Sequence, residues 1–479
     1  MISKVFSLKK KRRITKLLPF IFSFLSSAIG IILNFILARA FGSDNYGEIQ
    51  YLVSLATTAS SFMTFGLSWI VVRDAKNENR SSQIINSVFT IFFFLAIFEA
   101  PIVFFILYNF TKITHDNYLF SLLVVIVAVI IGTNTLGASY FQGRGKYHIS
   151  ILVSNFFPKL CMLIMTIFFL VIGKIMNFQE NYLIFYLIFY GISSLIILKK
   201  LFKKTEIKIT KSEGLSIFFF FGVTMTYSLS GELTKIFQTT FFNNPASTGI
   251  ISLSITLIAF VGIITNVITD MTKPYFAKLK RENDYEGILN TYRLNTRLTS
   301  YICIPFYIFM ITQGSKFLSF FGPSYTIYPY LIIMLAFRSL VADITGPSGT
   351  MLSMIGKEKI ELINGFINIG TFVLFAFIFS NDEVYGLCFA LLLSTIVVNI
   401  TKYIEVWVLF RKTPLDIKTL ITLLVIAVID FFAIFFLKFI GNMWIWLIVA
   451  ISVGLLTIGV NFLVSLYRKD LRAFFKINV

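Results

Sequence analysis

Charged residues are scarce in this sequence. They make up 14% of its 479 residues, whereas a soluble domain has about 25%. Hydrophobic residues account for 57% and the mean hydropathy is +0.83. The apolar residues come in runs of about 20 or more, enough to cross about 30 Å of hydrocarbon as a helix. Backbone groups in lipid must be paired internally, and such long runs suit helices rather than barrel strands. The sequence predicts an all-α, polytopic membrane protein.

Histidine and cysteine are nearly absent. The two histidines, His115 and His148, fall on opposite sides of the membrane in the topology below, which argues against a histidine zinc site or a Ser-His triad. The cysteines, Cys161, Cys303 and Cys388, lie inside apolar runs without metal-ligand spacing. No G-x-x-x-x-G-K-[ST] phosphate loop occurs in the sequence. We therefore expect no metal, no cofactor and no enzyme activity.

About fourteen apolar runs are long enough to span a bilayer. The first is too long for the apolar region of a signal peptide, which has about 7–15 residues. The predicted spans are 17–41, 47–72, 84–109, 117–141, 150–173, 181–201, 214–241, 248–273, 294–313, 326–351, 361–380, 384–410, 416–439 and 442–466.

The basic residues set the orientation of these spans. Both termini and every second loop hold 32 lysines and arginines, whereas the intervening loops hold four. Because basic loops stay in the cytoplasm, both termini are predicted to be cytoplasmic. The net charge of +19 follows this alternation, so we do not expect a nucleic-acid partner.

The loops are short, so the activity must lie among the helices. The expected parts are a basic N-terminus (1–16), a first lobe (17–201), a basic linker (202–213), a second lobe (214–410), a helix pair (411–466) and a C-terminal tail (467–479). The longest loop, 273–293, is read either as a solvated connector or as an amphipathic helix on the inner surface. In the second reading Phe276, Leu279, Ile288 and Leu289 would face lipid.

Two helix-loop segments resemble each other. "NFILARAFGSDNYGEIQYLVSL" and "KIFQTTFFNNPASTGIISLSIT" both have a short outside loop between apolar runs, and Gly47 corresponds to Gly249. Six spans separate the copies, which suits parallel repeats around a central cavity. Turn residues at short loops alone can also produce such similarity.

Charges inside spans are the candidate functional residues, because charge at a helix centre costs about 2.5–3.5 kcal/mol on insertion scales. The prominent ones are Arg39, Glu99, Lys159, Glu232, Lys235, Arg338 and Asp343, followed by Asp270, Arg297, Lys402, Glu405 and Asp430. Arg338 and Lys159 lie deepest, about 18 and 14 Å from the nearer ends of their spans.

Several of these charges also have a purely structural interpretation. Arg39 and Lys235 are near enough to the outer surface for their side chains to reach the headgroups. Glu232 and Lys235 are three residues apart and can pair with each other. Asp270 and Arg297 lie near the inner surface, where a charge is ordinary.

Five segments in register resemble the polysaccharide flippases of the multidrug/oligosaccharidyl-lipid/polysaccharide exporter superfamily. They are "ILARAFGSDNYGEIQ", "FGLSWIVVRDA", "KPYFAKLKRENDYE", "IPFYIFMITQGSKFLSFFGPSY" and "GTMLSMIGKEKIELINGFINIG". The resemblance implies two pseudo-symmetric six-helix lobes and a C-terminal helix pair like that of the lipid II flippases. It departs at "GELTKIF", where the family often has Asp-Arg, so a role for Lys235 carried over from the family is weakly founded.

The resemblance also implies a function: export of an undecaprenyl-diphosphate-linked oligosaccharide to the outer leaflet of the bacterial inner membrane, for O-antigen, capsule or related polymers. Arg39, Lys159, Lys235 and Arg338 are the expected substrate contacts, and Glu99, Glu232 and Asp343 the expected ion-coupling groups. "TGPSGT" at 345–350 and Pro329 are expected to let the tenth span bend during alternating access. Membrane lipid, a polysaccharide polymerase and a chain-length regulator are the implied partners. The alternatives are an ion-coupled multidrug exporter and a membrane glycosyltransferase or assembly scaffold.

Overall fold

The computed structural model is all-helical in the part of the chain that it describes. This part comprises residues 2–74, 78–110, 118–172, 178–201, 217–226, 232, 235–236, 244–467, 470 and 473–474. Its residues form helices and turns and include no strand, as predicted. They divide into two compact units: unit 1 (Met1–Ala40 and Glu48–Glu232) and unit 2 (Phe41–Gly47 and Leu233–Val479). The predicted lobe boundaries at 201 and 214 stay a prediction.

The described residues contain ten helices that are long and apolar enough to cross a membrane, or eleven if one bent pair is counted as a span. Thirteen of the predicted spans fall on helices of the structure. The seventh, 214–241, lies mostly outside the described residues, which include an apolar helix at Ile217–Thr226. The protein therefore has the many-span helical architecture expected from its hydropathy.

The first helix is two spans joined at a glycine. Helix α1 is continuous from Ile2 to Thr64 by hydrogen bonding, but Gly42 within it is non-helical, with φ 72° and ψ 178°. Glycine adopts positive φ without the steric cost that a Cβ atom imposes. The chain can therefore turn back at this point, as the first two predicted spans require.

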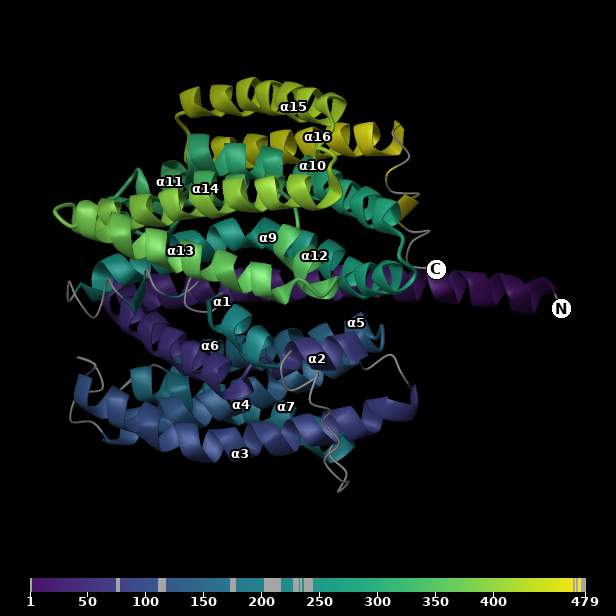
Figure 1. Ribbon diagram of the computed structural model, residues 1–479. Coiled ribbons are helices and arrows are strands. Elements are labelled where there is room, and N and C mark those ends of the chain that lie inside the picture. The colour runs from purple at the N-terminus through teal and green to yellow at the C-terminus, as the bar shows by residue number, and fades with distance from the viewer. Residues whose placement is uncertain are drawn as a thin grey trace. The chain divides into compact units, whose positions relative to one another are not determined.

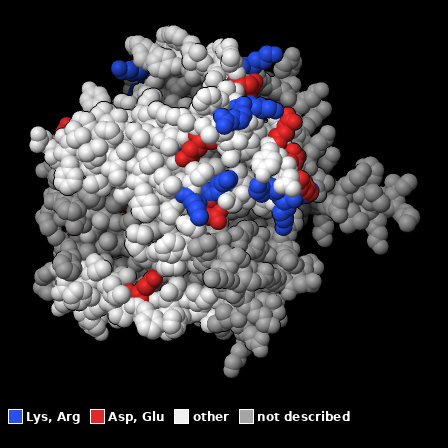
Figure 2. All heavy atoms as spheres, viewed as in Figure 1, with Lys and Arg blue, Asp and Glu red and all other residues white. Residues whose placement is uncertain are grey.

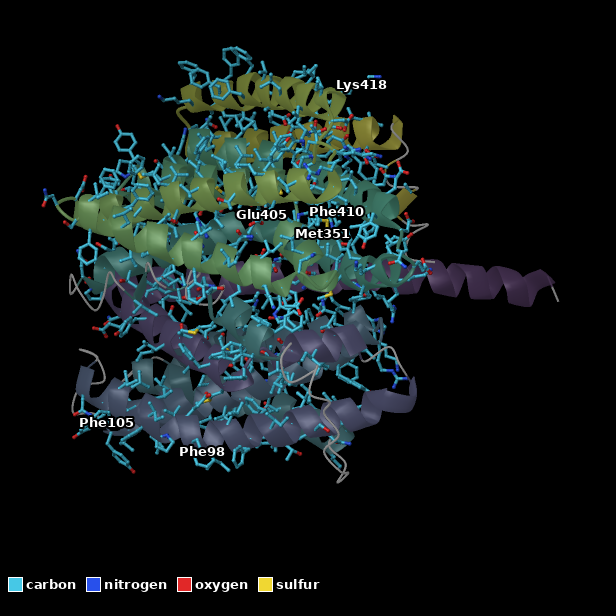
Figure 3. All side chains as sticks on the ribbon, in the orientation of Figure 1. Phe98, Phe105, Met351, Glu405, Phe410 and Lys418 are labelled. Atoms are coloured by element: carbon cyan, nitrogen blue, oxygen red, sulfur yellow. The ribbon has the colours of Figure 1, made fainter. Side chains whose placement is uncertain are left out.

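Unit 1 packs its other helices around an apolar core. They are α2 (Leu67–Asp74), α3 (Glu78–Phe110), α4 (Tyr118–Gly143), α5 (Tyr147–Ile151), η1 (Leu152–Phe156), α6 (Phe157–Ile172) and α7 (Phe178–Leu201). Met63, Phe89, Phe92 and Val124 are almost fully buried in this core. Phe98 and Phe105 of α3, by contrast, are each 60% exposed, and Figure 3 shows them at the edge of the unit. This face of α3 is suited to contact lipid.

Unit 2 holds the remaining helices. They are α9 (Pro245–Arg281), α10 (Tyr285–Leu318), η2 (Ser319–Phe321), η3 (Pro323–Thr326), α11 (Leu331–Ile344), α12 (Ser348–Met354), α13 (Glu358–Ile378), α14 (Glu383–Phe410), α15 (Ile417–Phe435), η4 (Phe436–Phe439) and α16 (Met443–Tyr467). Figure 1 shows α13 and α14 running side by side, with α15 and α16 next to α10.

The longest loop is not a helix lying on the membrane surface. Helices α9 and α10 both continue into it and leave only a turn at 282–284, where Asp284 Oδ1 accepts the backbone N–H of Gly287 at 2.8 Å. Phe276, Leu279, Ile288 and Leu289 are at most 3% exposed. The prediction that they face lipid is wrong. The apolar pattern marks helix-to-helix packing beyond the span, which has the same period as a membrane-facing stripe.

The C-terminal helix pair is fixed to α10 by polar contacts. Trp446 Nε1 donates to Gln313 Oε1 at 3.1 Å, and Gln313 Nε2 donates to the carbonyl of Ile434 at 3.2 Å. Nearer the other end of α10, Arg297 binds Asp470 through both Nε and Nη2, at 3.2 and 2.9 Å. Arg297 is therefore half of an ion pair rather than an isolated surface charge.

Charge in unit 2 gathers at one end of its helices. Figure 2 shows blue and red side chains concentrated where the turns at 282–284, 355–357 and 411–416 lie. Asp270 belongs to this end, and its carboxylate is 2.6 Å from Lys273 Nζ. This distribution agrees with the alternation of basic loops in the sequence.

The two glycines that correspond in the repeated segments meet in space. A Cβ atom on Gly47 would lie 1.8 Å from the Pro245 carbonyl oxygen and 2.9 Å from the Gly249 nitrogen. A Cβ atom on Gly249 would lie 2.3 Å from the Ser43 carbonyl oxygen. The backbones touch here, and only residues without a side chain allow that approach.

Candidate functional site

Lys159 is a cation in unit 1 without a bonding partner. It makes no hydrogen bond or ion pair with any described residue. Its half-buried side chain lies against α1, since a Cβ atom on Gly30 would be 3.7 Å from Lys159 Nζ. Next to it, Asn34 Nδ2 donates to the Gly30 carbonyl at 2.8 Å. An ammonium group in an apolar setting without a counter-charge favours the arrival of an anion.

A local irregularity precedes Lys159. Residues Leu152–Phe156 form a single π-helical turn, and the α-helix resumes at Phe157. Such turns are rare and often occur at functional sites. The extra residue in the turn rotates the rest of the helix about its axis, and with it the direction in which Lys159 points.

Arg338 is the corresponding cation in unit 2. Its Nε donates to Thr395 Oγ1 of α14 at 3.1 Å, and no described carboxylate lies within 4.0 Å of the guanidinium. The remaining N–H groups of Arg338 are not used in this contact. A guanidinium offers a planar fork to phosphate, so this group is suited to bind an anionic substrate.

Two other intramembrane carboxylates of unit 2, Asp343 and Asp430, are bound by groups other than Arg338. Asp343 Oδ2 accepts from the hydroxyl of Tyr307 at 2.5 Å and from Cys303 Sγ at 3.3 Å. Asp430 is buried and accepts from Asn461 Nδ2 at 3.2 Å. Neither acid therefore forms an ion pair with Arg338 in this conformation.

The tenth span is bent just beyond Arg338. Helices α11 and α12 meet at 42° across the break predicted at 345–350, where Gly346 has φ 81°. The break is held by side chains of neighbouring helices: Tyr292 donates to the carbonyl of Thr345, and Thr345 Oγ1 donates to Asn399 Oδ1 at 2.6 Å. The break lies at the predicted stretch, and its bending during transport stays a prediction.

The other four predicted site residues come from other segments of the chain. Arg39 is exposed and lies three residues before the Gly42 break. Glu232, in unit 1, and Lys235, in unit 2, are each half-buried. Glu99 is half-buried on α3, and its Oε2 has no hydrogen-bond partner. The roles of all four residues stay predictions.

Sequence reasoning missed one buried polar cluster. Glu361 and Asn364 of α13 meet Lys402 and Glu405 of α14, and Lys402 Nζ is 2.6 Å from Glu361 Oε1. Lys402 and Glu405 stood out only as intramembrane charges, whereas Glu361 coincides with the predicted start of its span. Glu361 and Asn364 are three residues apart on one helix, and Lys402 and Glu405 are three residues apart on the next. This spacing, which puts each pair on one face of its helix, is the signal that could have found the cluster.

Comparison with known proteins shows a sequence similarity in the first half of the chain and a shared fold over most of it. Residues 18–237 match the sequence model of the family described as "Polysaccharide biosynthesis protein". Among solved structures, the lipid II flippase MurJ in an inward closed conformation has a TM-score of 0.64 at 14% identity, covering 95% of this chain and 99% of MurJ. A comparison with curated proteins gives no match.

Two further structures have the same fold. A MATE protein in complex with MaL6 has a TM-score of 0.60 at 14% identity, covering 83% of this chain and 98% of that protein. A transporter of the MOP superfamily from Pyrococcus furiosus, described as having a binding pocket of reversed polarity, has a TM-score of 0.61 at 13% identity, covering 83% of this chain and 96% of that one. The chain therefore shares the fold of the lipid II flippase and of these transporters. Its residues 18–237 are in addition similar in sequence to the polysaccharide biosynthesis family.

Proposed function

We propose that this protein is a flippase that moves an undecaprenyl-diphosphate-linked oligosaccharide from the inner to the outer leaflet for the synthesis of a cell-surface polysaccharide such as O-antigen or capsule. The observation that carries the proposal is the pair of intramembrane cations, Lys159 in unit 1 and Arg338 in unit 2, neither of which has a carboxylate partner among the residues that the structure describes. The family match over 18–237 and the fold shared with MurJ support a lipid-linked substrate.

The chemistry of the substrate requires such cations. A diphosphate moved into hydrocarbon without counter-charges loses hydration worth tens of kcal/mol in the Born limit. Arg338 supplies a fork for two phosphate oxygens, and Lys159 supplies a point charge. Arg39 and Lys235 add contacts nearer the outer surface. The polyprenyl tail stays in lipid, where it needs no protein site.

Movement follows an alternating-access cycle in which the bend between α11 and α12 changes the direction of the helix that carries Arg338. The membrane field favours export, because moving one negative charge outward gains about 2.3 kcal/mol per 100 mV. Glu99, Glu232 and Asp343 are the groups proposed to couple a proton or sodium ion to this cycle.

The proposed setting is the bacterial cell membrane, with both termini in the cytoplasm. This orientation rests on the excess of basic residues in alternate loops. A polysaccharide polymerase and a chain-length regulator are the proposed partners, since they act on the product that a flippase delivers to the outer surface.

Two other functions compete with this proposal. An exporter of small molecules is supported by the fold shared with the MATE proteins. An exporter of organic cations, however, needs acidic groups in its cavity, whereas the two deepest intramembrane charges, Lys159 and Arg338, are cationic. A glycosyltransferase or assembly scaffold would need neither Lys159 nor Arg338, so neutralising both would leave its activity intact.

The test is transport by the purified protein in proteoliposomes. A fluorescent undecaprenyl-diphosphate oligosaccharide is placed in one leaflet, and its arrival in the other is followed by quenching with a reagent that cannot cross the membrane. We expect transport by the native chain and its loss in the Lys159→Ala/Arg338→Ala variant. Export of an organic cation by the native chain, without movement of the lipid-linked sugar, would establish the MATE-like function instead.

A further inference from the structure

A second group of buried charges in unit 2 has no role in the proposed flipping site. It joins the first turns of α13 to the last turns of α14 through Glu361, Asn364, Lys402 and Glu405. Glu405 lies ten residues along α14 from Thr395, the partner of Arg338, which is about 15 Å at the rise of a helix. The cluster is therefore separate from the Arg338 site and nearer the charged end of unit 2. Figure 3 shows Glu405 in the body of that unit, and Lys418 at its edge.

The cluster has one more carboxylate than it has cations. Lys402 Nζ lies 2.6 Å from Glu361 Oε1, and the two side chains are 12% and 1% exposed. These charges compensate each other. Glu405 is half-buried, and its carboxylate accepts a hydrogen bond from a neutral group, Asn364 Nδ2, at 2.7 Å. A carboxylate with only an amide partner in such a place costs free energy, which the binding of one positive charge removes.

The side chain between the two acids can respond to that charge. Asn364 is fully buried, and its Nδ2 also lies 3.4 Å from Glu361 Oε2. Its Oδ1 is buried and has no hydrogen-bond partner in the described part of the chain. An amide oxygen left without a donor is unusual in a protein interior. It is the acceptor that a protonated carboxyl group needs, and rotation of the carboxamide brings it toward Glu405.

We propose that Glu405 is a proton-binding site, exchanging one proton with water at the charged end of unit 2, and that Asn364 turns its carboxamide with each exchange. With Glu405 ionised, Asn364 Nδ2 donates to Glu405 Oε2. When a proton from water bonds to a carboxylate oxygen, the new O–H donates to Asn364 Oδ1. Lys402 keeps its proton and its ion pair with Glu361 throughout, so the net change is one bound proton.

The surroundings favour a proton over a metal ion. Lys402 already occupies the space beside Glu361, and Asn364 presents its N–H groups rather than its oxygen to both acids. The charged groups that face Glu405 are Lys402 on its own helix and Glu361 on α13. From α10, Tyr292 comes within electrostatic range of Lys402, and its hydroxyl is committed to the Thr345 carbonyl. On α11, Arg338 and Asp343 are engaged with Thr395 and Tyr307.

Proton binding at this place affects the contact between α13 and α14. The Asn364–Glu405 hydrogen bond joins these helices, and the same helix α14 carries Thr395 and Asn399, which hold Arg338 and the bend after it. A group that binds a proton more tightly in one conformation shifts the balance toward that conformation. In this last step the inference rests on the proposed function, with Glu405 making the transport cycle dependent on pH.

The proton site is tested by infrared spectroscopy of the reconstituted protein during a pH titration. We expect a carboxylic-acid C=O band that appears as the pH is lowered, is lost in Glu405→Gln and is kept in the matched control Glu286→Gln, whose carboxylate is exposed at the α9–α10 turn. Asn364→Ala keeps the acid but removes its hydrogen-bond partner, so the band should shift in frequency and in midpoint pH. A band unchanged in Glu405→Gln overturns the site, and one unchanged in Asn364→Ala overturns the turning carboxamide.

A transport assay distinguishes a failure of the proton site from a failure of the proposed flippase function. If the band titrates through Glu405 but no lipid-linked sugar moves, the proton site stands and the proposed substrate falls. If the sugar moves with the same pH dependence in the native protein and in Glu405→Gln, the proton site falls and the flippase stands. Should Glu405→Gln fail to fold, the Asn364→Ala titration decides alone.

Discussion

Arg338 and Asp343 lie five residues apart on α11 and do not form an ion pair. The guanidinium binds the hydroxyl of Thr395, and the carboxylate accepts hydrogen bonds from Tyr307 and Cys303. Five residues correspond to about 500° around a helix, so the two side chains point to different sides. The arginine is held in position by a neutral partner, and its charge stays available.

Replacing Arg338 should impair transport more than folding. Arg338→Ala removes a charge-assisted contact worth about 1.5–3 kcal/mol, which is about ten- to a hundredfold in substrate affinity. Arg338→Lys should recover only part of this, because the charge remains and the fork is lost. The measurements are thermal stability and uptake of the lipid-linked sugar. A stable Arg338→Ala protein with native transport would remove Arg338 from the substrate site.

Lys159→Met should separate stability from function in unit 1. Methionine keeps most of the volume and removes an ammonium group that has no partner, so the melting temperature should stay the same or rise. Transport of the diphosphate lipid should fall at least tenfold, whereas Lys159→Arg should keep a measurable part. A Lys159→Met protein that unfolds at a lower temperature would show that the charge has a structural partner.

Because the backbones at Gly47 and Gly249 are in close contact, adding one methyl group at Gly47 should clearly lower the stability of the protein. In Gly47→Ala the new Cβ atom would overlap the Pro245 carbonyl oxygen, so the backbones must separate and stability should fall by about 1–3 kcal/mol. The matched control is Gly454→Ala in α16, where nothing lies within 4 Å of the new atom. Alanine there should be neutral or stabilising by up to about 1 kcal/mol. Equal melting temperatures for the two variants would contradict the close approach.

The ion pair of Arg297 and Asp470 predicts rescue by a second substitution. Arg297→Met strands Asp470, which is 5% exposed at its side chain, and should cost about 3–5 kcal/mol of stability. Arg297→Met/Asp470→Leu removes both charges and should return most of that loss. The double-mutant cycle is measured by thermal unfolding in detergent. Simple additivity of the two losses would show that the residues do not interact.

Cysteine labelling from outside intact cells tests the proposed orientation. Single cysteines at Glu282 or Lys412, in the charged turns of unit 2, should be protected from a reagent that cannot cross the membrane. A cysteine at Asn381, at the opposite ends of α13 and α14, should react. The native cysteines are buried or half-buried, and the unsubstituted chain measures their background. Reaction at Lys412 together with protection at Asn381 would reverse the topology.

Hydropathy predicted thirteen spans that fall on helices, and the Gly-Pro stretch at 345–350 predicted where the tenth span is broken, because run length and helix-breaking residues are local properties of the sequence. Lys159 and Arg338 became candidates in the same way, because an intramembrane charge is visible without knowledge of its neighbours. The sequence did not show which helices contact each other. For that reason the cluster around Glu361 was missed, and the buried face of Phe276 was assigned to lipid. A periodic apolar stripe indicates that a face is covered but does not identify what covers it.

The polar contacts between α10 and the C-terminal helices limit how the chain can be shortened. A protein ending at Phe410 would keep α10 but lose the groups that bind it. Arg297 would lose Asp470, and the Tyr301 carbonyl would lose Asn461. Gln313 would lose Trp446 and the carbonyl of Ile434, and Lys316 would lose the carbonyl of Ile440. The groups left without partners would lie at points up to about 28 Å apart along the helix, from Arg297 to Lys316, and those within the bilayer would be unpaired in hydrocarbon. A twelve-span form of this protein therefore requires a redesigned α10 surface, and deletion of the last two helices alone should produce a chain that does not insert stably.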